Sequence, residues 1–335
     1  MYALLGTTLV LALLLTINAM ATIATAGLGR VSKRVLWKCS ARTRAEILFV
    51  MRIGAPVIAI VALVAFTIPS YLIYEPHKTE EFVSWKLGTL AVLSAAGVIL
   101  AISRGVRSWL ATRSLLKTWL ATATPIQLDA IPVPAFVVQH PFPIIAVVGA
   151  VRPRLFIADQ VLDSLSQEEL AAAIAHECGH LAAHDNFKRS LMRISRAALL
   201  LIPCGRSLDR AWSDASESAA DEHAAERSSL VALNLASALV RIAKMIPKGQ
   251  HQIMPASVST FLSDVETPGV KMRVRRLVEL AASDRRQFAS TAPLFRLLPW
   301  LALTAFVVIA VSVESRPQVL AAVHSVLEQI VRILS

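Results

Sequence analysis

The sequence predicts an α-helical membrane protein with four transmembrane helices that carries one α+β domain outside the bilayer. Hydrophobic residues make up 55% of the 335 residues and charged residues only 17%, whereas ordinary soluble domains contain ~25% charged residues. Uncharged runs long enough to cross a bilayer recur along the chain. One long segment between them is polar enough to form a compact domain.

The uncharged runs define the predicted spans. The first covers residues 1–29, the second runs from Ile53 to Tyr74, the third lies between Lys86 and Arg104, and the fourth between Arg296 and Glu314. Flanking basic side chains can extend to the membrane interface beside the two shorter runs. For the first run, a cleaved signal peptide ending near residues 24–26 is the alternative.

These spans divide the chain into four parts. Residues 1–103 are predicted to hold three transmembrane helices and a basic cytoplasmic loop, and residues 104–296 the cytoplasmic domain. Residues 297–313 form the fourth span, and residues 314–335 a short amphipathic helical tail with apolar residues at helical spacing.

Charge distribution predicts the orientation. The net charge is +11, and basic residues follow the first and third spans, whereas Glu75, Glu80 and Glu81 follow the second. The positive-inside rule then places the N-terminus outside and the domain in the cytoplasm, at the cell inner (plasma) membrane. The basic segment Lys271–Arg276 is expected to contact anionic lipid headgroups rather than nucleic acid.

The domain combines predicted strands with a capped helix. Ala135–Gln139, Ile144–Val148 and Leu155–Ala158 are β-rich and bounded by Pro and Gly. Ser166 and Glu169 form a capping box, from which a helix is expected to run through about His184. The three cysteines, Cys39, Cys178 and Cys204, form no CxxC pair, which argues against a disulfide framework and a cysteine zinc site.

That helix contains His176, Glu177 and His180 in an H-E-x-x-H motif. Residues four apart share a helix face, so both imidazoles can bind one metal ion. Zinc, the metal that these ligand types favour, lowers the pKa of a bound water, and Glu177 can take its proton as the water attacks a carbonyl. A catalytic zinc usually has a third protein ligand.

Two candidates for that ligand lie downstream on a second Ala-rich helical segment. Glu217 and Asp221 are four residues apart, so Glu217 would bind zinc while Asp221 orients an imidazole. His223 is the other candidate, but it lies on a different face and would touch substrate or solvent. His184 and Asp185 are expected near the metal ligands, Asp185 equally as a structural group at the helix end. His223 and Arg227 are candidates for stabilising the transition state.

These motifs resemble those of integral-membrane gluzincin peptidases. The likeness covers roughly residues 104–225 and is greatest to the peptidase module of BlaR/MecR-type antibiotic sensors, with HtpX-type quality-control proteases as near relatives. It rests on Gly149–Ile157, Leu165–Leu170, His176–His180, Asp185-Asn186 and the pair Glu217 and Asp221. The resemblance implies a gluzincin-like metallopeptidase domain with one zinc per chain, the ligands His176, His180 and Glu217, and Glu177 as the base.

The expected function is a membrane-embedded zinc metalloendopeptidase that cleaves a membrane-associated or cytoplasmic protein, with regulatory proteolysis as one version. HtpX-like quality control of membrane proteins is the alternative. A non-proteolytic signal transducer or scaffold is the alternative of another class, although Glu177 would then have no role. BlaR-type sensors carry a penicillin-binding domain after the last span, and only the short tail stands there in this sequence, so β-lactam sensing is not expected.

Overall fold

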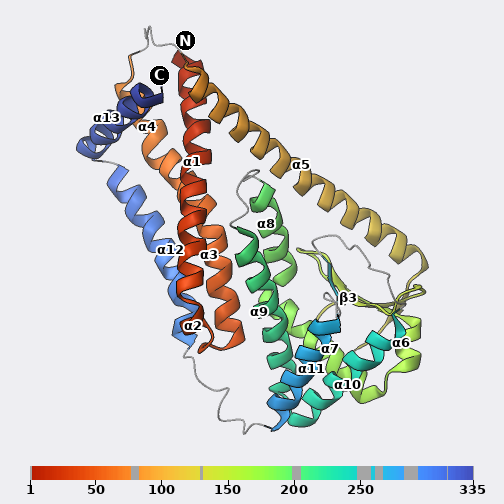
Figure 1. Cartoon of the computed structure of the whole chain (residues 1–335). Coiled ribbons are helices and arrows are strands. Elements are labelled where there is room, and N and C mark those ends of the chain that lie inside the picture. The colour runs from red at the N-terminus through yellow and green to blue at the C-terminus, as the bar shows by residue number, and fades with distance from the viewer. Residues whose placement is uncertain are drawn as a thin grey trace.

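The structure is a computed structural model in which an elongated helical bundle adjoins a smaller α+β domain (Figure 1). It describes residues 2–76, 83–128, 131–197, 205–246, 258–260, 267–282, 293–314 and 316–334.

Long apolar helices form the bundle. They are α1 (Tyr2–Val31), the short α2 (Lys33–Leu36), α3 (Ala41–Ala62) continued by a π-helical turn (Leu63–Thr67) into α4 (Ile68–Tyr74), α5 (Trp85–Thr122), α12 (Pro293–Glu314) and α13 (Pro317–Leu334). Among the described residues, four segments are long and apolar enough to cross a membrane: Tyr2–Val31, Ala41–Tyr74, Trp85–Thr122 and Leu297–Glu314. Within the described residues, each of the four predicted spans lies in one of them.

Two of these helices extend more than ten residues beyond the predicted spans. The second starts at Ala41, where the Ser40 side chain accepts the backbone N–H of Thr43. The third, α5, passes through Arg104 without a break, because Arg and Lys are good helix formers and do not by themselves end a helix. It ends just before Pro125, since the residue preceding a proline avoids the helical conformation.

The long helix α9 (Gly205–Ala225) joins the domain to the bundle by packing along α3. Near its start, Asp209 accepts a hydrogen bond from Arg52 of α3 at 2.9 Å, and both side chains are buried. Near its end, Glu222 accepts the backbone N–H of Ala41 at 3.0 Å and a hydrogen bond from Arg276. Side-chain contacts near both ends of α9 therefore hold it against α3, a candidate membrane helix.

The domain contains one five-stranded sheet among the described residues. Its strands are β1 (Thr124–Ile126), β2 (Ala135–Val138), β3 (Ile145–Val148), β4 (Arg154–Ala158) and β5 (Val258–Thr260), arranged in the order β1-β2-β4-β3-β5. Only β2 and β4 are parallel; the other neighbours are antiparallel. The three predicted strands are thus confirmed within one residue at each end, whereas β1 and β5 are too short to have been recognised.

Helices cover the sheet and form the site. They are α6 (Asp159–Ser164), α7 (Gln167–Ala183), α8 (Asp185–Ala197), α9, α10 (Ser229–Met245) and α11 (Thr267–Ala282). The core contains buried residues of β3 and β4 together with small residues of α7 and with Leu235 and Leu239 of α10. Small residues on α7 allow the sheet and the neighbouring helices to approach it closely.

The predicted capping box at the start of α7 is confirmed. The Ser166 hydroxyl accepts the backbone N–H of Glu169 at 3.2 Å, and the Glu169 carboxylate accepts the backbone N–H of Ser166 at 2.9 Å. Both bonds satisfy donors that the first helical turn leaves unpaired, so the start of α7 is fixed by the sequence locally.

The C-terminal tail forms the predicted helix, α13. Its apolar residues Leu320 and Leu327 are buried, and the main-chain carbonyl of Leu320 accepts a hydrogen bond from Ser70 at 2.8 Å. In Figure 1, α13 lies beside α4, at the end of the bundle opposite the α+β domain. The apolar face of the tail is therefore partly covered by protein.

Candidate metal centre and substrate groove

The centre of the site lies on α7, where the H-E-x-x-H side chains are buried. His176 and Glu177 have no exposed surface and His180 is 2% exposed. The two imidazole rings lie on one face of the helix, with centroids 4.8 Å apart and nearly perpendicular planes. This is the arrangement that a spacing of four residues on a helix predicts.

Helix α9 places Glu217 against both imidazoles. The Oε2 atom of Glu217 lies 3.7 Å from Nε2 of His176, and its Oε1 atom lies 3.7 Å from Nε2 of His180. One ligand atom from each of these three residues lies within 4.8 Å of the others. The structure therefore brings together the three predicted ligands, in a group that could hold a metal ion.

Two aspartates contact the other ring nitrogens. Nδ1 of His176 lies 3.0 Å from Oδ1 of Asp221, and Nδ1 of His180 lies 2.7 Å from Oδ2 of Asp185. Each carboxylate can accept the Nδ1 proton, which fixes the tautomer and leaves Nε2 available on the side of Glu217. Aspartates in this position commonly orient metal-binding histidines.

The turn after α7 positions Asp185. His184 ends the helix with a left-handed backbone (φ 56°), so that α8 begins at Asp185 in a new direction. Oδ2 of Asp185 also accepts the hydroxyl of Ser216 at 2.7 Å, which links the end of α7 to the residue preceding Glu217. Asp185 thus contacts a histidine of the site and also stands at a helix end, so the structure contains both features that the two interpretations of Asp185 describe.

Burial and neighbouring charges shift the pKa values of the site. Burial lowers the pKa of His176. Burial also disfavours the ionised form of Glu217, but Arg273 and His180 hold the pKa of this carboxyl below its usual range. For His180, burial is outweighed by Glu217 and Asp185, which raise its pKa to about 9. A metal ion binding there must displace a proton from His180, so metal affinity should rise with pH.

Orphaned atoms show that these side chains fit a bound metal and water. Among the described residues, Nε2 of His180 and both carboxylate oxygens of Glu177 are buried without a hydrogen-bond partner. Burial raises the pKa of Glu177 to about 8, although His180 acts in the opposite direction. Buried polar atoms normally have partners, and a ligand set of two imidazoles and one carboxylate suits zinc.

Arg273 of α11 is a residue of the site that the sequence analysis missed. Its guanidinium lies 3.1 Å from Glu217 Oε2 and donates to Asp221 at 2.6 Å, and only 14% of the side chain is exposed. The prediction that Lys271–Arg276 contacts lipid is wrong for Arg273, whose guanidinium faces the interior, while Arg276 pairs with Glu222. The sequence feature that could have identified Arg273 is its spacing: it lies four residues before the buried Leu277 and so shares the apolar face of α11.

Gly179 allows α7 and α9 to approach closely. A Cβ atom at this position would lie 2.9 Å from Cα of Ala220 and 3.2 Å from Cβ of His223. Ala220 is buried at this crossing. The small residues bring Glu217, one turn earlier on α9, within reach of the histidines.

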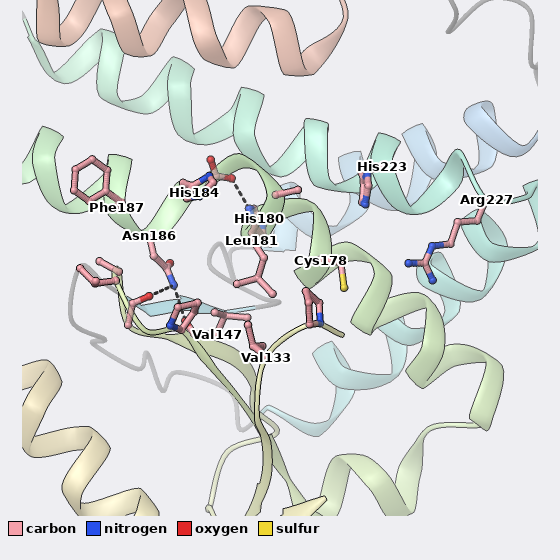
Figure 2. Close-up of a pocket in the computed structure, with 17 residues that line it drawn as sticks. Val133, Val147, Cys178, His180, Leu181, His184, Asn186, Phe187, His223 and Arg227 are labelled. Carbon is pink, nitrogen blue, oxygen red and sulfur yellow. Dashed lines mark hydrogen bonds and ion pairs between the residues drawn. The ribbon is translucent and has the colours of Figure 1, made fainter. Parts of the chain in front are cut away.

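A groove of about 480 Å³ lies beside the metal-binding group. His180, Leu181, Val133 and Val147 line it, together with the end of β3 and the following turn. In Figure 2, His223 and Arg227 lie on one side of His180, and Asn186 and Phe187 on the other. The groove therefore extends to both sides of His180, a predicted metal ligand.

The remaining predicted residues line this groove. His184 is exposed at the end of α7, and His223 and Arg227 stand near the end of α9. None of these three belongs to the group of residues that could hold a metal ion. The structure therefore separates them from the metal-binding group and places them in the lining of the adjacent groove.

The comparisons with known proteins agree with this site. Residues 136–294 match the model of peptidase family M48, a range that begins in β2 and includes α7, α9 and α11. The comparisons with curated proteins and with solved structures gave no match. Metallopeptidases of family M48 are generally zinc-dependent, and the His176, His180 and Glu217 group fits such a metal. The match supports a metallopeptidase domain of the gluzincin type in this chain.

Proposed function

We propose that the protein is a membrane-embedded zinc metalloendopeptidase that hydrolyses peptide bonds of a membrane-associated or cytoplasmic protein. The observation that carries this proposal is the convergence of His176, His180 and Glu217 within 4.8 Å of one another. Beside them lies the Glu177 carboxylate, which has no hydrogen-bond partner among the residues that the structure describes. A bare scaffold would gain nothing from a buried carboxylate without a partner, since such a group costs stability.

In this proposal His176, His180 and Glu217 hold the metal ion. When bound, zinc would act as a Lewis acid that lowers the pKa of water and polarises a carbonyl. Asp221 and Asp185 keep the two imidazoles in the tautomer that leaves Nε2 available. Arg273 keeps Glu217 and Asp221 ionised by placing a positive charge between them.

Glu177 is the proposed proton carrier. Its carboxylate takes a proton from the attacking water and then gives a proton to the leaving amine, first as general base and then as general acid. The pKa of about 8 that burial confers on Glu177 would fall when a cation is bound nearby, which favours the ionised form needed in the first step.

The experiment compares the full chain with the Glu177→Gln variant, both purified in detergent and loaded with zinc. We expect about one zinc per chain in each, and loss of cleavage of fluorescently labelled casein by roughly 10²–10⁴-fold in the variant. His176→Ala should lose the metal as well. Cleavage by Glu177→Gln at the rate of the unchanged protein would refute the mechanism.

We further propose that the domain faces the cytoplasm from the inner membrane. The support is the excess of Arg and Lys after the first and third spans, as the positive-inside rule requires. A periplasmically active reporter fused after Ser335 should then be active, and one inserted after residue 227 should not. The opposite pattern would contradict the orientation without affecting the chemistry of the site.

A further inference from the structure

We propose that Arg227 and His223 form a subsite that binds a carboxylate of the peptide substrate, either an acidic side chain or a free C-terminus. The proposal rests on the proposed function in one respect, that the occupant of the groove is a peptide. It adds a preference in the choice of substrate that the metal-binding residues do not provide.

Position is the first argument. His223 stands in the last turn of α9, and Arg227 follows in the turn that leads to α10. Both line the same groove as His180. In Figure 2 their side chains project beside Cys178 of α7, to one side of His180. A substrate whose scissile bond lies near His180 would therefore pass them within a few residues.

The composition of the groove is the second argument. Among the described residues that line it, Arg227 is the one Arg or Lys side chain. Most other lining residues are apolar, and the one acidic residue, Asp185, is already hydrogen-bonded to His180 and Ser216. An acidic group of a bound peptide would consequently find its cationic partner at this end of the groove.

The surroundings of His223 make this end positive. The positive charges of Arg42 on α3 and of Arg227 lower the pKa of His223, whereas the negative charge of Glu226 raises it. Glu226 lies 3.8 Å from Nδ1 of His223 and is 68% exposed, so water screens it. Burial is the main reason that the pKa of His223 is lowered, which leaves a neutral imidazole able to donate one hydrogen bond while the arginines supply charge.

Recognition would then follow ordinary carboxylate chemistry. The planar guanidinium of Arg227 can donate two parallel hydrogen bonds to a carboxylate, and the imidazole can donate a third. Arg227 is exposed without substrate, so part of the attraction is screened by water until a peptide covers it.

The test measures peptide binding without hydrolysis. The zinc-loaded Glu177→Gln full chain in nanodiscs is titrated with fluorescein-labelled octapeptides of Ala and Leu, in which one Glu or Gln is moved through every position. A second pair differs only in a free or amidated C-terminus. We expect the acidic peptide of one pair to bind about fivefold more tightly than its neutral partner, and that pair identifies the source of the carboxylate.

Charge reversal provides the decisive comparison. In the Arg227→Glu background the preference should invert, so that Lys at the selected position, or an amidated C-terminus, binds better than the acidic form. The matched reversal Arg332→Glu, on the exposed face of α13, should leave the preference unchanged. Three results would each overturn the subsite. They are equal affinities for the acidic and neutral peptides when Arg227 is unchanged, no binding of any peptide, and the same preference in Arg227→Glu. Casein cleavage by the protein with Glu177 intact tests the proposed function separately.

Discussion

The guanidinium of Arg52 donates from Nε to Oδ1 of Asp209 at 2.9 Å, with 1% of the Arg52 side chain and 8% of the Asp209 side chain exposed. Arg52 belongs to α3, a candidate membrane helix, and Asp209 to α9, the helix that also carries Glu217. This buried ion pair joins the bundle to the candidate metal centre.

Breaking this ion pair should lower the stability of the folded protein. We expect Arg52→Ala to lower the free energy of unfolding by about 3–5 kcal/mol, because it leaves the Asp209 carboxylate buried without its cation. The double variant Arg52→Leu/Asp209→Leu should recover most of the loss. Thermal unfolding in detergent measures both, with the exposed Arg210→Ala as control. An unchanged melting temperature in Arg52→Ala would contradict this account of the contact.

Arg273 should make stability depend on metal. Without zinc, Arg273→Ala leaves Glu217 and Asp221 buried with no guanidinium between them, so the variant should lose several kcal/mol of stability. A bound cation replaces part of that charge, so zinc should stabilise the variant more than it stabilises the unchanged protein. Melting temperatures with zinc and with EDTA test this, and Arg275→Ala, 83% exposed, serves as control. Equal stabilisation by zinc in both proteins would be the contrary result.

The helix crossing at Gly179 should control metal affinity. Gly179→Ala puts a methyl group 2.9 Å from Cα of Ala220, which should separate α7 from α9, cost about 1–3 kcal/mol and weaken zinc binding by moving Glu217. Competition with a chelating dye measures the affinity. At Gly54 an added Cβ meets no described neighbour within 4 Å, so Gly54→Ala should leave zinc binding unchanged. If both variants bind zinc equally well, close approach is not what positions Glu217.

The capping box should contribute acid-sensitive stability. Burial raises the pKa of Glu169, but the Ser237 hydroxyl, the Ser166 N–H and Arg241 together bring it below the ordinary value of 4.5. Because the folded-state pKa is lower than the unfolded one, the contribution is complete above about pH 4.5 and is lost as the pH falls through the folded pKa.

Glu169→Gln should therefore lose about 1–2 kcal/mol at pH 7, and the difference from the unchanged protein should shrink toward pH 3. Urea unfolding at several pH values measures this difference. The exposed Asp163→Asn on α6 controls for the loss of a nearby charge. A difference that stayed constant from pH 7 to pH 3 would show that ionisation of Glu169 is not involved.

Local sequence signals predicted much of this structure. The apolar runs, the Ser166–Glu169 capping box and the spacing of His176 and His180 each depend on residues within a few turns of one another. Glu217 could be predicted although it lies far from His176 and His180 in the sequence, because its spacing to Asp221 places both carboxylates on one helix face.

Contacts between distant helices were not predictable in the same way. Arg273 belongs to a basic run whose composition alone favours a lipid surface, and only packing of α11 against α9 shows which arginine enters the site. Arg52 is similar, since the sequence gives no indication that Asp209 lies beside it. Spacing within a helix identifies a face, but it does not identify the partner of that face.

The position of Arg273 on α11 has a consequence for biosynthesis. The ribosome makes α7 and α9, with their histidines and carboxylates, well before it makes α11. Until α11 has emerged and folded back, Glu217 and Asp221 lack the guanidinium that lies between them in the finished protein. We therefore expect a nascent chain that ends after α10 to depend more on a bound cation for stability at this group than the finished protein does.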